Sequence, residues 1–437
     1  MKTIVLDDDP TGTQSATGVT VLLECDAELL EAALRRSDSV YVQTNSRALP
    51  EAEAVALVTR IRAEGEEAAR RLSAPVRFVL RGDSTLRGHV FAETEVFLRE
   101  AAAAGAQDAA DGSGSDAVML FVPAFPEGGR TTVDGVHLVR VGDEVLPAHR
   151  TEYADDPVFP FSTGVLADYV AEKSGRPAVT VPLAVVRAGG TAAALAEAPA
   201  GAVVLPDAET AADVAAIAAA VDEATAAGTR VVVRSAAPLA AALAGVTSAG
   251  LLELPLVPRA AATLLVCGSH TAGATAQLAH VERAWGAPAV VDTAAALEDA
   301  PAAGRAAGRA VLAQLESRPL GIVTTERRRS LDHGTLDHGE RVMTALTTAV
   351  REVLPHVEVV VSKGGITSAE VARTGIGATS ALVLGQVLPG VSVWSMRAHD
   401  DREILYVVVP GNVGTPDTLT RVLDAVSLTS PSADAPR

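Results

Sequence analysis

Three consecutive aspartates follow a short apolar segment at the start of the chain. The segment Thr3 to Leu6 is expected to form a strand, and Asp7-Asp8-Asp9 come directly after it, just before Pro10 and Gly12. Carboxylates this close repel one another, which raises at least one pKa unless a cation or a donor-rich ligand lies among them. Proline and glycine end the strand, so the acids are expected at its carboxyl end, where open α/β sheets bind ligands. The alternative is a solvated turn.

A second polar loop carries arginines. The segment Val76 to Leu80 leads into Arg81-Gly82-Asp83-Ser84-Thr85-Leu86-Arg87-Gly88, and a helix is expected after it. Guanidinium groups bind carboxylate or phosphate bidentately, while Ser84 can donate to a hydroxyl or to an anion near the helix N-terminus. Asp83, Ser84 and Arg87 are therefore candidates for binding a small hydroxylated anion. The alternative is that Asp83 only caps the helix and the arginines lie on the surface.

A third strand end also delivers an arginine. The expected strand Val118 to Val122 ends in Pro123-Ala124-Phe125-Pro126, and Arg130 follows Gly128-Gly129. Prolines stiffen such a loop and glycines let its backbone approach a ligand closely, so Arg130 is expected to be held in place for binding. A plain turn is the alternative.

Three glycine-bearing loops in the second half predict a phosphate site. They follow the expected strands at 264–267, 357–361 and 405–409, and a helix is expected after each. Backbone N–H groups at helix N-termini bind phosphate. The spacing matches neither the P-loop nor the dinucleotide fingerprint, so the nucleotide hypothesis depends on the three loops converging. The candidate residues are Ser269, Lys363, Gly364, Gly365, Thr367, Gly411 and Gly414.

Other chemistry receives little support from the residues. His333, Asp337, His338 and Glu340 fall in one polar stretch, which we interpret as a hydrophilic loop or helix start; no metal site is predicted. Cys25 and Cys267 lie in separate apolar segments and are expected to be reduced core thiols. There is no nucleophile elbow of the Gly-x-Ser-x-Gly type.

Composition limits the class of protein. The 437 residues are 48% hydrophobic and 21% charged, which is ample for buried cores and predicts two or three domains. A net charge of −18 disfavours nucleic acid and anionic membranes as partners. Apolar runs are too short to cross a bilayer, and Lys2 followed by acids does not fit a signal peptide, so a cytoplasmic protein is expected.

The elements that must position these residues alternate between strand and helix, which predicts an α/β fold. The segment Glu51 to Leu72 is expected to be a helix, because its apolar residues recur on one stripe. The helical pattern stops around Val246 to Arg259, and a second α/β series begins at Thr263. We therefore expect two α/β domains, at 1–248 and 259–437, with a ligand cleft between them.

Taken together, these motifs resemble the four-carbon acid sugar kinase family over nearly the whole chain. The resemblance rests on Asp8-Asp9-Pro10-Thr11-Gly12, Asp83-Ser84-Thr85-Leu86-Arg87-Gly88, the loop around Arg130, and the late glycine-rich loops, in this order. It implies an N-terminal domain that binds the sugar acid and a C-terminal domain that binds ATP. The reaction it implies is phosphorylation of threonate, erythronate, a 3-oxo-tetronate or a related acid, in carbohydrate metabolism, with Mg²⁺ carried on the ATP.

The resemblance also assigns roles to residues. It places Asp8, Asp9, Asp83, Arg87 and Arg130 on the sugar-acid side, and the late glycine-bearing loops on the ATP side. Asp8 or Asp9 is expected to deprotonate the attacking hydroxyl, Arg87 and Arg130 to grip the carboxylate, and Lys363 to hold phosphate with the glycine amides.

The chain departs from the family pattern at two places. Ile366 stands where many members carry glutamate, and Thr13 and Ser15 replace the usual alanine and later aspartate. One alternative is therefore a non-catalytic sensor that binds a sugar acid and a nucleotide. Another is a metal-dependent aldolase or hydrolase, which would need His333 and His338 to converge with acids. Whether the chain forms a homo-oligomer is open.

Overall fold

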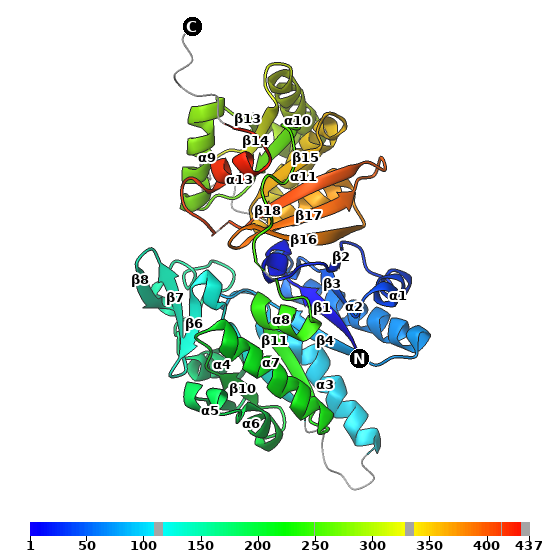
Figure 1. Ribbon diagram of the computed structural model, residues 1–437, viewed down its shortest axis with the longest axis vertical. Helices are drawn as coiled ribbons and strands as arrows, with labels where there is room; N and C mark the ends of the chain where they lie inside the picture. Colours follow the sequence, from blue (N-terminus) through cyan, green and yellow to red (C-terminus); the bar gives the residue numbers. More distant parts are fainter. Residues whose placement is uncertain (109–116, 249, 328–335, 412, 430–437) are drawn as a thin grey trace. The chain divides into compact units, whose positions relative to one another are not determined.

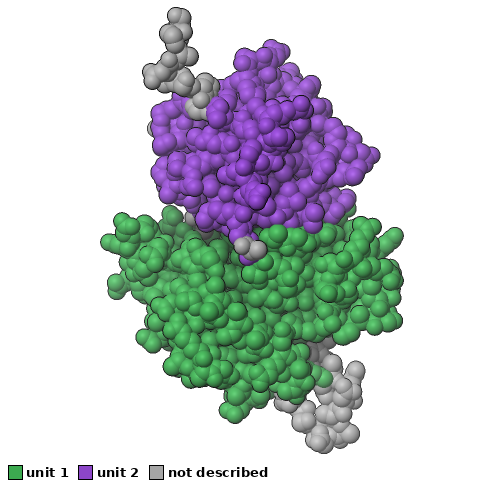
Figure 2. All heavy atoms as spheres, in the orientation of Figure 1, with its two compact units in different colours: residues 1–247 green, residues 248–437 purple. Residues whose placement is uncertain are grey.

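The computed structural model describes residues 1–108, 117–248, 250–327, 336–411 and 413–429. They fall into two compact units, Met1–Thr247 and Ser248–Arg437 (Figure 2). Each unit has its own run of paired strands (Figure 1) and its own hydrophobic core.

The sheet of the first unit is parallel throughout. Its strand order is β2-β3-β1-β4-β11-β5-β10-β9. Parallel sheets are covered on both faces, so their strands are apolar throughout, as the buried Ile4, Val5 and Leu6 are. The strands are β1 (Lys2–Asp7), β2 (Thr20–Leu22), β3 (Ser39–Gln43), β4 (Val76–Arg81), β5 (Val118–Val122), β9 (Ala178–Val181), β10 (Val203–Pro206) and β11 (Val231–Ser235).

Helices pack on this sheet in two groups. In one, α1 contacts α2 and α2 contacts α3; in the other, α8 contacts α7 and lies on β1, β4 and β11. The helices are α1 (Ala27–Arg36), α2 (Glu51–Leu72), α3 (Val90–Asp108), α4 (Leu166–Ser174), α5 (Leu183–Arg187), α6 (Thr191–Glu197), α7 (Ala211–Ala226) and α8 (Ala237–Ala244).

The order in which successive strands join the sheet reverses beside β1. From β1 it passes through β2 to β3 on one side and then returns to β4 on the other. This is a topological switch point, where the loops after the flanking strands diverge and leave room for a ligand. Asp7 and Arg81 are register partners at the carboxyl ends of β1 and β4, so the switch point brings the first two predicted loops together.

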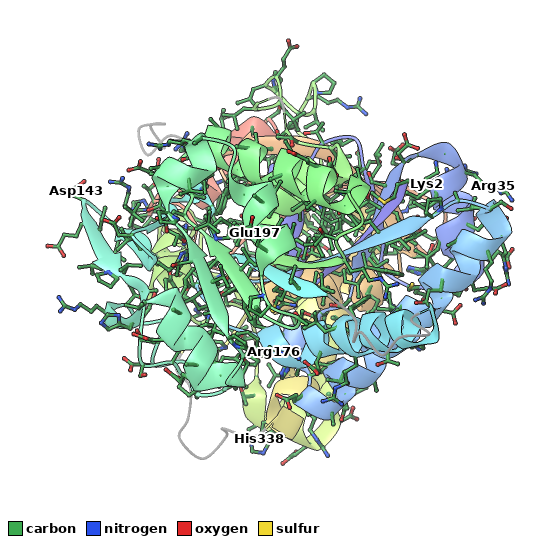
Figure 3. The ribbon with its side chains drawn as sticks, turned by 90° about the horizontal axis from the view of Figure 1, so that it is seen from below. Lys2, Arg35, Asp143, Arg176, Glu197 and His338 are labelled. Atoms are coloured by element: carbon green, nitrogen blue, oxygen red, sulfur yellow. The ribbon has the colours of Figure 1, made fainter. Side chains whose placement is uncertain are left out.

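A small antiparallel sheet is inserted after β5. It consists of β6 (Arg130–Val133), β7 (Val136–Val141) and β8 (Glu144–Pro147), with Asp143 at the outer end of the β7–β8 hairpin (Figure 3). The sequence pattern does not predict this sheet, because its strands are short and mixed in polarity.

The sheet of the second unit has the order β13-β14-β12-β15-β18-β17-β16. It is parallel from β13 to β18, and antiparallel from β18 to β16. A second switch point lies between β12 and β15, because β13 and β14 are on one side of β12 and β15 on the other. The strands are β12 (Thr263–Cys267), β13 (Ala289–Val291), β14 (Leu320–Thr325), β15 (Val359–Lys363), β16 (Ser380–Leu388), β17 (Val391–Arg397) and β18 (Glu403–Val409).

The helices of the second unit also form two groups. α9 contacts α13, and α10 contacts α11. They are α9 (Ala272–Trp285), α10 (Thr293–Leu315), α11 (Leu336–Val353), α12 (Gly365–Glu370) and α13 (Thr418–Ala425). Short 3-10 turns and one π-helical turn, η7 (Val371–Ile376), complete the described elements.

The predicted α/β class is confirmed. Helix α2 has the bounds expected from its apolar stripe, and β12 those expected from its apolar run. Within the described residues, no helix is both long and apolar enough to cross a membrane.

Candidate functional site

Asp7, Asp8 and Asp9 lie at the carboxyl end of β1, as predicted, and they are almost completely buried. Their exposed fractions are 0%, 2% and 3%. Asp9 caps the 3-10 turn η1 (Pro10–Ser15), because its Oδ1 accepts a 2.7 Å hydrogen bond from the Thr11 amide. The turn therefore forms where the sequence places proline after a capping acid. Burial on this scale excludes a solvated turn.

Arg81 supplies the cation that the acids require. Its Nη1 lies 3.0 Å from Asp7 Oδ1, 3.2 Å from Asp8 Oδ1 and 3.4 Å from Asp9 Oδ1. One guanidinium cannot neutralise three buried carboxylates. Burial raises the pKa of Asp7 to about 7, since the attraction of Arg81 does not offset it and the Asp8 charge adds to it.

Gly12 is required by the position of the Asp7 carboxylate. A Cβ at residue 12 would collide with both oxygens of Asp7. The glycine predicted to end the strand therefore also lets the η1 backbone lie against a buried acid.

Asp83 joins the same cluster through two arginines. Its Oδ2 accepts a 2.8 Å bond from Arg87 Nε, and its Oδ1 lies 3.5 Å from Arg47 Nη1. Arg47, from the turn η2 (Ser46–Ala48), also pairs with Asp9 Oδ2. Although burial alone would raise the pKa of Asp83, Arg87 and Arg47 hold it well below its usual range. Asp83 is thus an ionised acid that orients two arginines.

Arg87 lies at the edge of the cluster. Its side chain is 22% exposed, its Nη1 is 3.5 Å from Asp156 Oδ2, and its guanidinium lies 5.0 Å from the centre of the Tyr153 ring. Ser84, next to Asp83 in the loop, is fixed by its carbonyl, which accepts a 2.8 Å bond from the buried His137.

Arg130 lies at the start of β6 and is 8% exposed. Its Nη1 donates to the Gly128 carbonyl, and its buried Nε has no hydrogen-bond partner among the described residues. His137 donates to the Ser84 carbonyl, next to Asp83. Burial first, and the charge of Arg130 as well, lower the pKa of that histidine to about 4. The described contacts do not join Arg130 directly to the aspartates.

Sequence reasoning missed two arginines of this cluster. Arg47 belongs to a turn after β3, and Arg234 to the carboxyl end of β11, the neighbour of β4. Arg234 Nη1 pairs with Glu93, and its Nη2 lies 3.6 Å from Asp8 Oδ2. For Arg234, the signal available in the sequence was a charged residue near the end of an otherwise apolar strand.

In the second unit, three predicted loops come together. A Cβ on Gly411 would lie 3.0 Å from Ser269 Oγ, and one on Gly364 would lie 3.0 Å from Ser269 Cβ and 3.2 Å from Thr367 Oγ1. Thr271, which caps α9, donates a 2.9 Å bond to the Gly411 carbonyl. Ser269, Gly364, Thr367 and Gly411 therefore gather at the carboxyl edge of β12, β15 and β18, and Gly365 begins α12 beside them.

Lys363 and Gly414 help to fix the conformation of the loop after β18. The Lys363 side chain is fully buried, and its Nζ donates to the carbonyls of Pro410 and Val413 at 2.6 and 3.2 Å. Burial lowers the pKa of Lys363 to about 8. Gly414, with φ +94°, packs against Thr418 at the start of α13.

Arg327 is a further cation near this cluster, and it is not among the site residues predicted from the sequence. It follows β14, donates to the Ser269 carbonyl, and lies 2.9 Å from Thr275 Oγ1 on α9. It thus brings positive charge to the Ser269 loop.

The polar stretch considered for metal binding is only partly described. His333 and the side chain of Asp337 lie outside the described residues, whereas His338 and Glu340 are on α11 (Figure 3). In the part of the chain that the structure describes, no three His, Cys, Asp or Glu side chains are grouped to hold a metal ion.

Comparison with known proteins matches both units to domain families. A family described as "Sugar-binding N-terminal domain" matches residues 3–243, and one described as "Nucleotide-binding C-terminal domain" matches residues 264–419.

Curated relatives of this chain are sugar-acid kinases by name. A D-erythronate kinase of Heliobacterium modesticaldum is 34% identical over 64% of this chain and 60% of its own length. A D-threonate kinase of Salmonella typhimurium is 31% identical over 45% of this chain and 42% of its own. A D-threonate kinase of Bordetella bronchiseptica is 29% identical over 91% of this chain and 88% of its own length. The match thus spans about three fifths of the first relative.

Two solved structures share the fold at 18% identity. A Salmonella typhimurium protein superposes with a TM-score of 0.65 over 96% of this chain and 98% of its own. A Haemophilus influenzae protein superposes with a TM-score of 0.60 over 97% of this chain and 100% of its own. The order of the two matched domains agrees with the resemblance found in the sequence. This chain belongs to the four-carbon acid sugar kinase family.

Proposed function

We propose that this protein is an ATP-dependent kinase that phosphorylates a hydroxyl of a four-carbon sugar acid of the threonate, erythronate or 3-oxo-tetronate type. The observation that carries the proposal is the buried cluster of aspartates and arginines around Asp8, in the unit that matches the sugar-binding domain. Residues 1–248 would bind the sugar acid, and residues 259–437 would bind the nucleotide. A cytoplasmic location is part of the same proposal.

Arg87 and Arg130 would bind the substrate carboxylate. Each has a guanidinium tied down at one end, Arg87 by Asp83 and Arg130 by the Gly128 carbonyl. An arginine fixed in this way loses little conformational entropy on binding, and its planar group matches a carboxylate. Ser84 and Asp83 lie in the same loop and would contact the substrate hydroxyls.

Asp8 would accept the proton of the attacking hydroxyl. Asp9 is committed on both oxygens, with Thr11 on Oδ1 and Arg47 on Oδ2. Asp7 is fully buried behind Gly12. Asp8 Oδ2 is buried without a hydrogen-bond partner in the described part of the chain, and it lies beside Gly88, which has no side chain. A base must have an oxygen left for its substrate, which favours Asp8 over Asp9.

The late loops would hold the nucleotide. Their donor set fits polyphosphate: Ser269 precedes α9, Gly364 has the left-handed φ of +116°, and Gly364 and Gly411 place backbone, not side chains, beside Ser269. Gly365 and Thr367 would add donors, and Gly414 would shape the loop. ATP would supply the phosphoryl group, with Mg²⁺ offsetting its charge.

Lys363 would act on this site indirectly. Its ammonium is occupied by the carbonyls of residues 410 and 413. We therefore assign it the task of fixing the Gly411 loop, in place of the direct phosphate contact expected from the sequence.

A substrate panel tests the proposal. Purified protein is assayed for ADP formation with ATP and Mg²⁺ against threonate, erythronate and 3-oxo-tetronates, and the product is identified by ³¹P NMR. Stimulation by one four-carbon acid is expected, and Asp8→Asn should strongly reduce it. Binding of acid and nucleotide without turnover across the panel would instead support the sensor.

A further inference from the structure

We propose that Arg234 is a positioning residue for the phosphoryl-transfer reaction: it holds the Asp8 carboxylate in place, and Glu93 fixes Arg234. This inference rests on the proposed kinase function, and within it on Asp8 as the base.

The three side chains form a buried chain of charges from α3 to β1. Glu93 Oε2 pairs with Arg234 Nη1, and Arg234 Nη2 lies 3.6 Å from Asp8 Oδ2. Arg234 is 1% exposed, and Glu93 and Asp8 are each 2% exposed. Charges this deeply buried are retained only when they are paired. Glu93 therefore holds Arg234 in place, and Arg234 holds Asp8.

The Arg81–Gly88 loop is shaped around Arg234. A Cβ on Gly82 would lie 2.7 Å from Arg234 Nε and 2.8 Å from its Cζ, so the guanidinium lies directly against the Gly82 backbone. A Cβ on Gly88 would lie 3.2 Å from Asp8 Oδ2 and 3.5 Å from Arg234 Nη2. The two glycines thus leave room for the Arg234–Asp8 pair.

The pair is incompletely bonded. Neither Arg234 Nη2 nor Asp8 Oδ2 has a hydrogen-bond partner within the described residues, although both atoms are buried. A separation of 3.6 Å is an ion pair beyond hydrogen-bond length. Arg234 therefore orients the Asp8 carboxylate electrostatically without occupying the oxygen that the substrate hydroxyl would use.

The experiment is a double-mutant cycle between Arg234 and Asp8. Arg234→Gln should lower kcat about 10²-fold, the cost of a misplaced catalytic group, while the Kd of the sugar acid stays unchanged. In an Asp8→Asn background the same substitution should change kcat by less than about 2-fold, because the group it positions is already gone. Arg234→Lys should recover most of the kcat, since it keeps the charge.

Two further variants keep the test valid if Arg234→Gln folds poorly. Glu93→Gln with Arg234→Gln removes both charges of the buried pair and should show the same loss of kcat. Arg77→Gln is the matched control: Arg77 is at the amino end of β4, pairs with Asp222, and should leave kcat unchanged.

The outcomes separate the two proposals. Equal losses of kcat in the wild-type and Asp8→Asn backgrounds, or a full kcat in the Glu93→Gln/Arg234→Gln protein, would overturn the role of Arg234 alone. Failure of the wild-type chain to consume ATP with any sugar acid would overturn the kinase function, and the role of Arg234 with it.

Discussion

The ammonium of Lys363 donates a 2.6 Å hydrogen bond to the carbonyl of Pro410, which ties the end of β15 to the loop after β18. A second bond, 3.2 Å long, reaches the Val413 carbonyl. The glycine loop that faces Ser269 is therefore fixed by a buried cation from the neighbouring strand.

Replacing Lys363 with methionine should weaken nucleotide binding. The substitution leaves two carbonyls without their donor, so KM for ATP is expected to rise about 10-fold and the free energy of unfolding to fall by about 1–3 kcal/mol. KM for the sugar acid should not change. Steady-state kinetics and denaturant titration measure these effects. Lys173→Met, at an exposed position on α4, is the control; a similar rise in KM there would contradict the assignment.

Asparagine at Asp8 and at Asp9 should have different effects. Asp8→Asn is expected to lower kcat about 10²–10⁴-fold, because its Oδ2 is the oxygen left for the substrate. Asp9→Asn should mainly lower stability, since Asp9 caps η1 and pairs with Arg47. Rapid kinetics and thermal unfolding separate the two effects. A larger loss of kcat in Asp9→Asn would move the base to Asp9.

Arg130→Ala should mainly weaken binding of the sugar acid. Losing a charged hydrogen bond to a carboxylate is expected to raise its Kd about 10- to 100-fold, with KM for ATP unchanged. Calorimetric titration of the sugar acid measures the effect. The exposed Arg150→Ala, in the same unit, is the control. Equal changes for both ligands would argue that Arg130 only supports the fold.

The buried His137 should make the protein less stable in mild acid. Its Nε2 donates to the Ser84 carbonyl, so its Nδ1 must accept from Thr132 Oγ1, and the neutral ring is satisfied. Burial lowers the pKa of His137 to about 4, whereas an unfolded histidine titrates near 6.5. The unfolded state therefore takes up a proton first as the pH falls, and stability is lost between pH 6.5 and 4.

The loss attributable to His137 should amount to about 3 kcal/mol in the free energy of unfolding. Denaturant titrations from pH 7 to pH 4 measure it. His137→Gln should flatten the profile in this window, whereas His280→Gln, at an exposed position on α9, should not. An unchanged slope in His137→Gln would show that other groups cause the acid sensitivity.

The sequence by itself determined the fold class and the places where chemistry is concentrated. Apolar strand segments and helices with one apolar face, such as α2, can be recognised from hydrophobic periodicity, because periodicity reflects which side of a segment is buried. Acids and glycines directly after a strand must lie at its carboxyl end, so spacing alone predicted that Asp8, Ser269 and Gly364 lie at strand ends.

Only the tertiary structure decided which strands are neighbours and which atoms are already used. Arg234 lies more than two hundred positions after Asp8, and the sheet order alone brings β11 to β4 and so Arg234 to Asp8. Lys363 is bound to carbonyls, and Asp9 is paired on both oxygens, which no local pattern records. The physical reason is that strand pairing and hydrogen-bond saturation depend on contacts between distant segments, whereas propensity and periodicity describe one segment at a time.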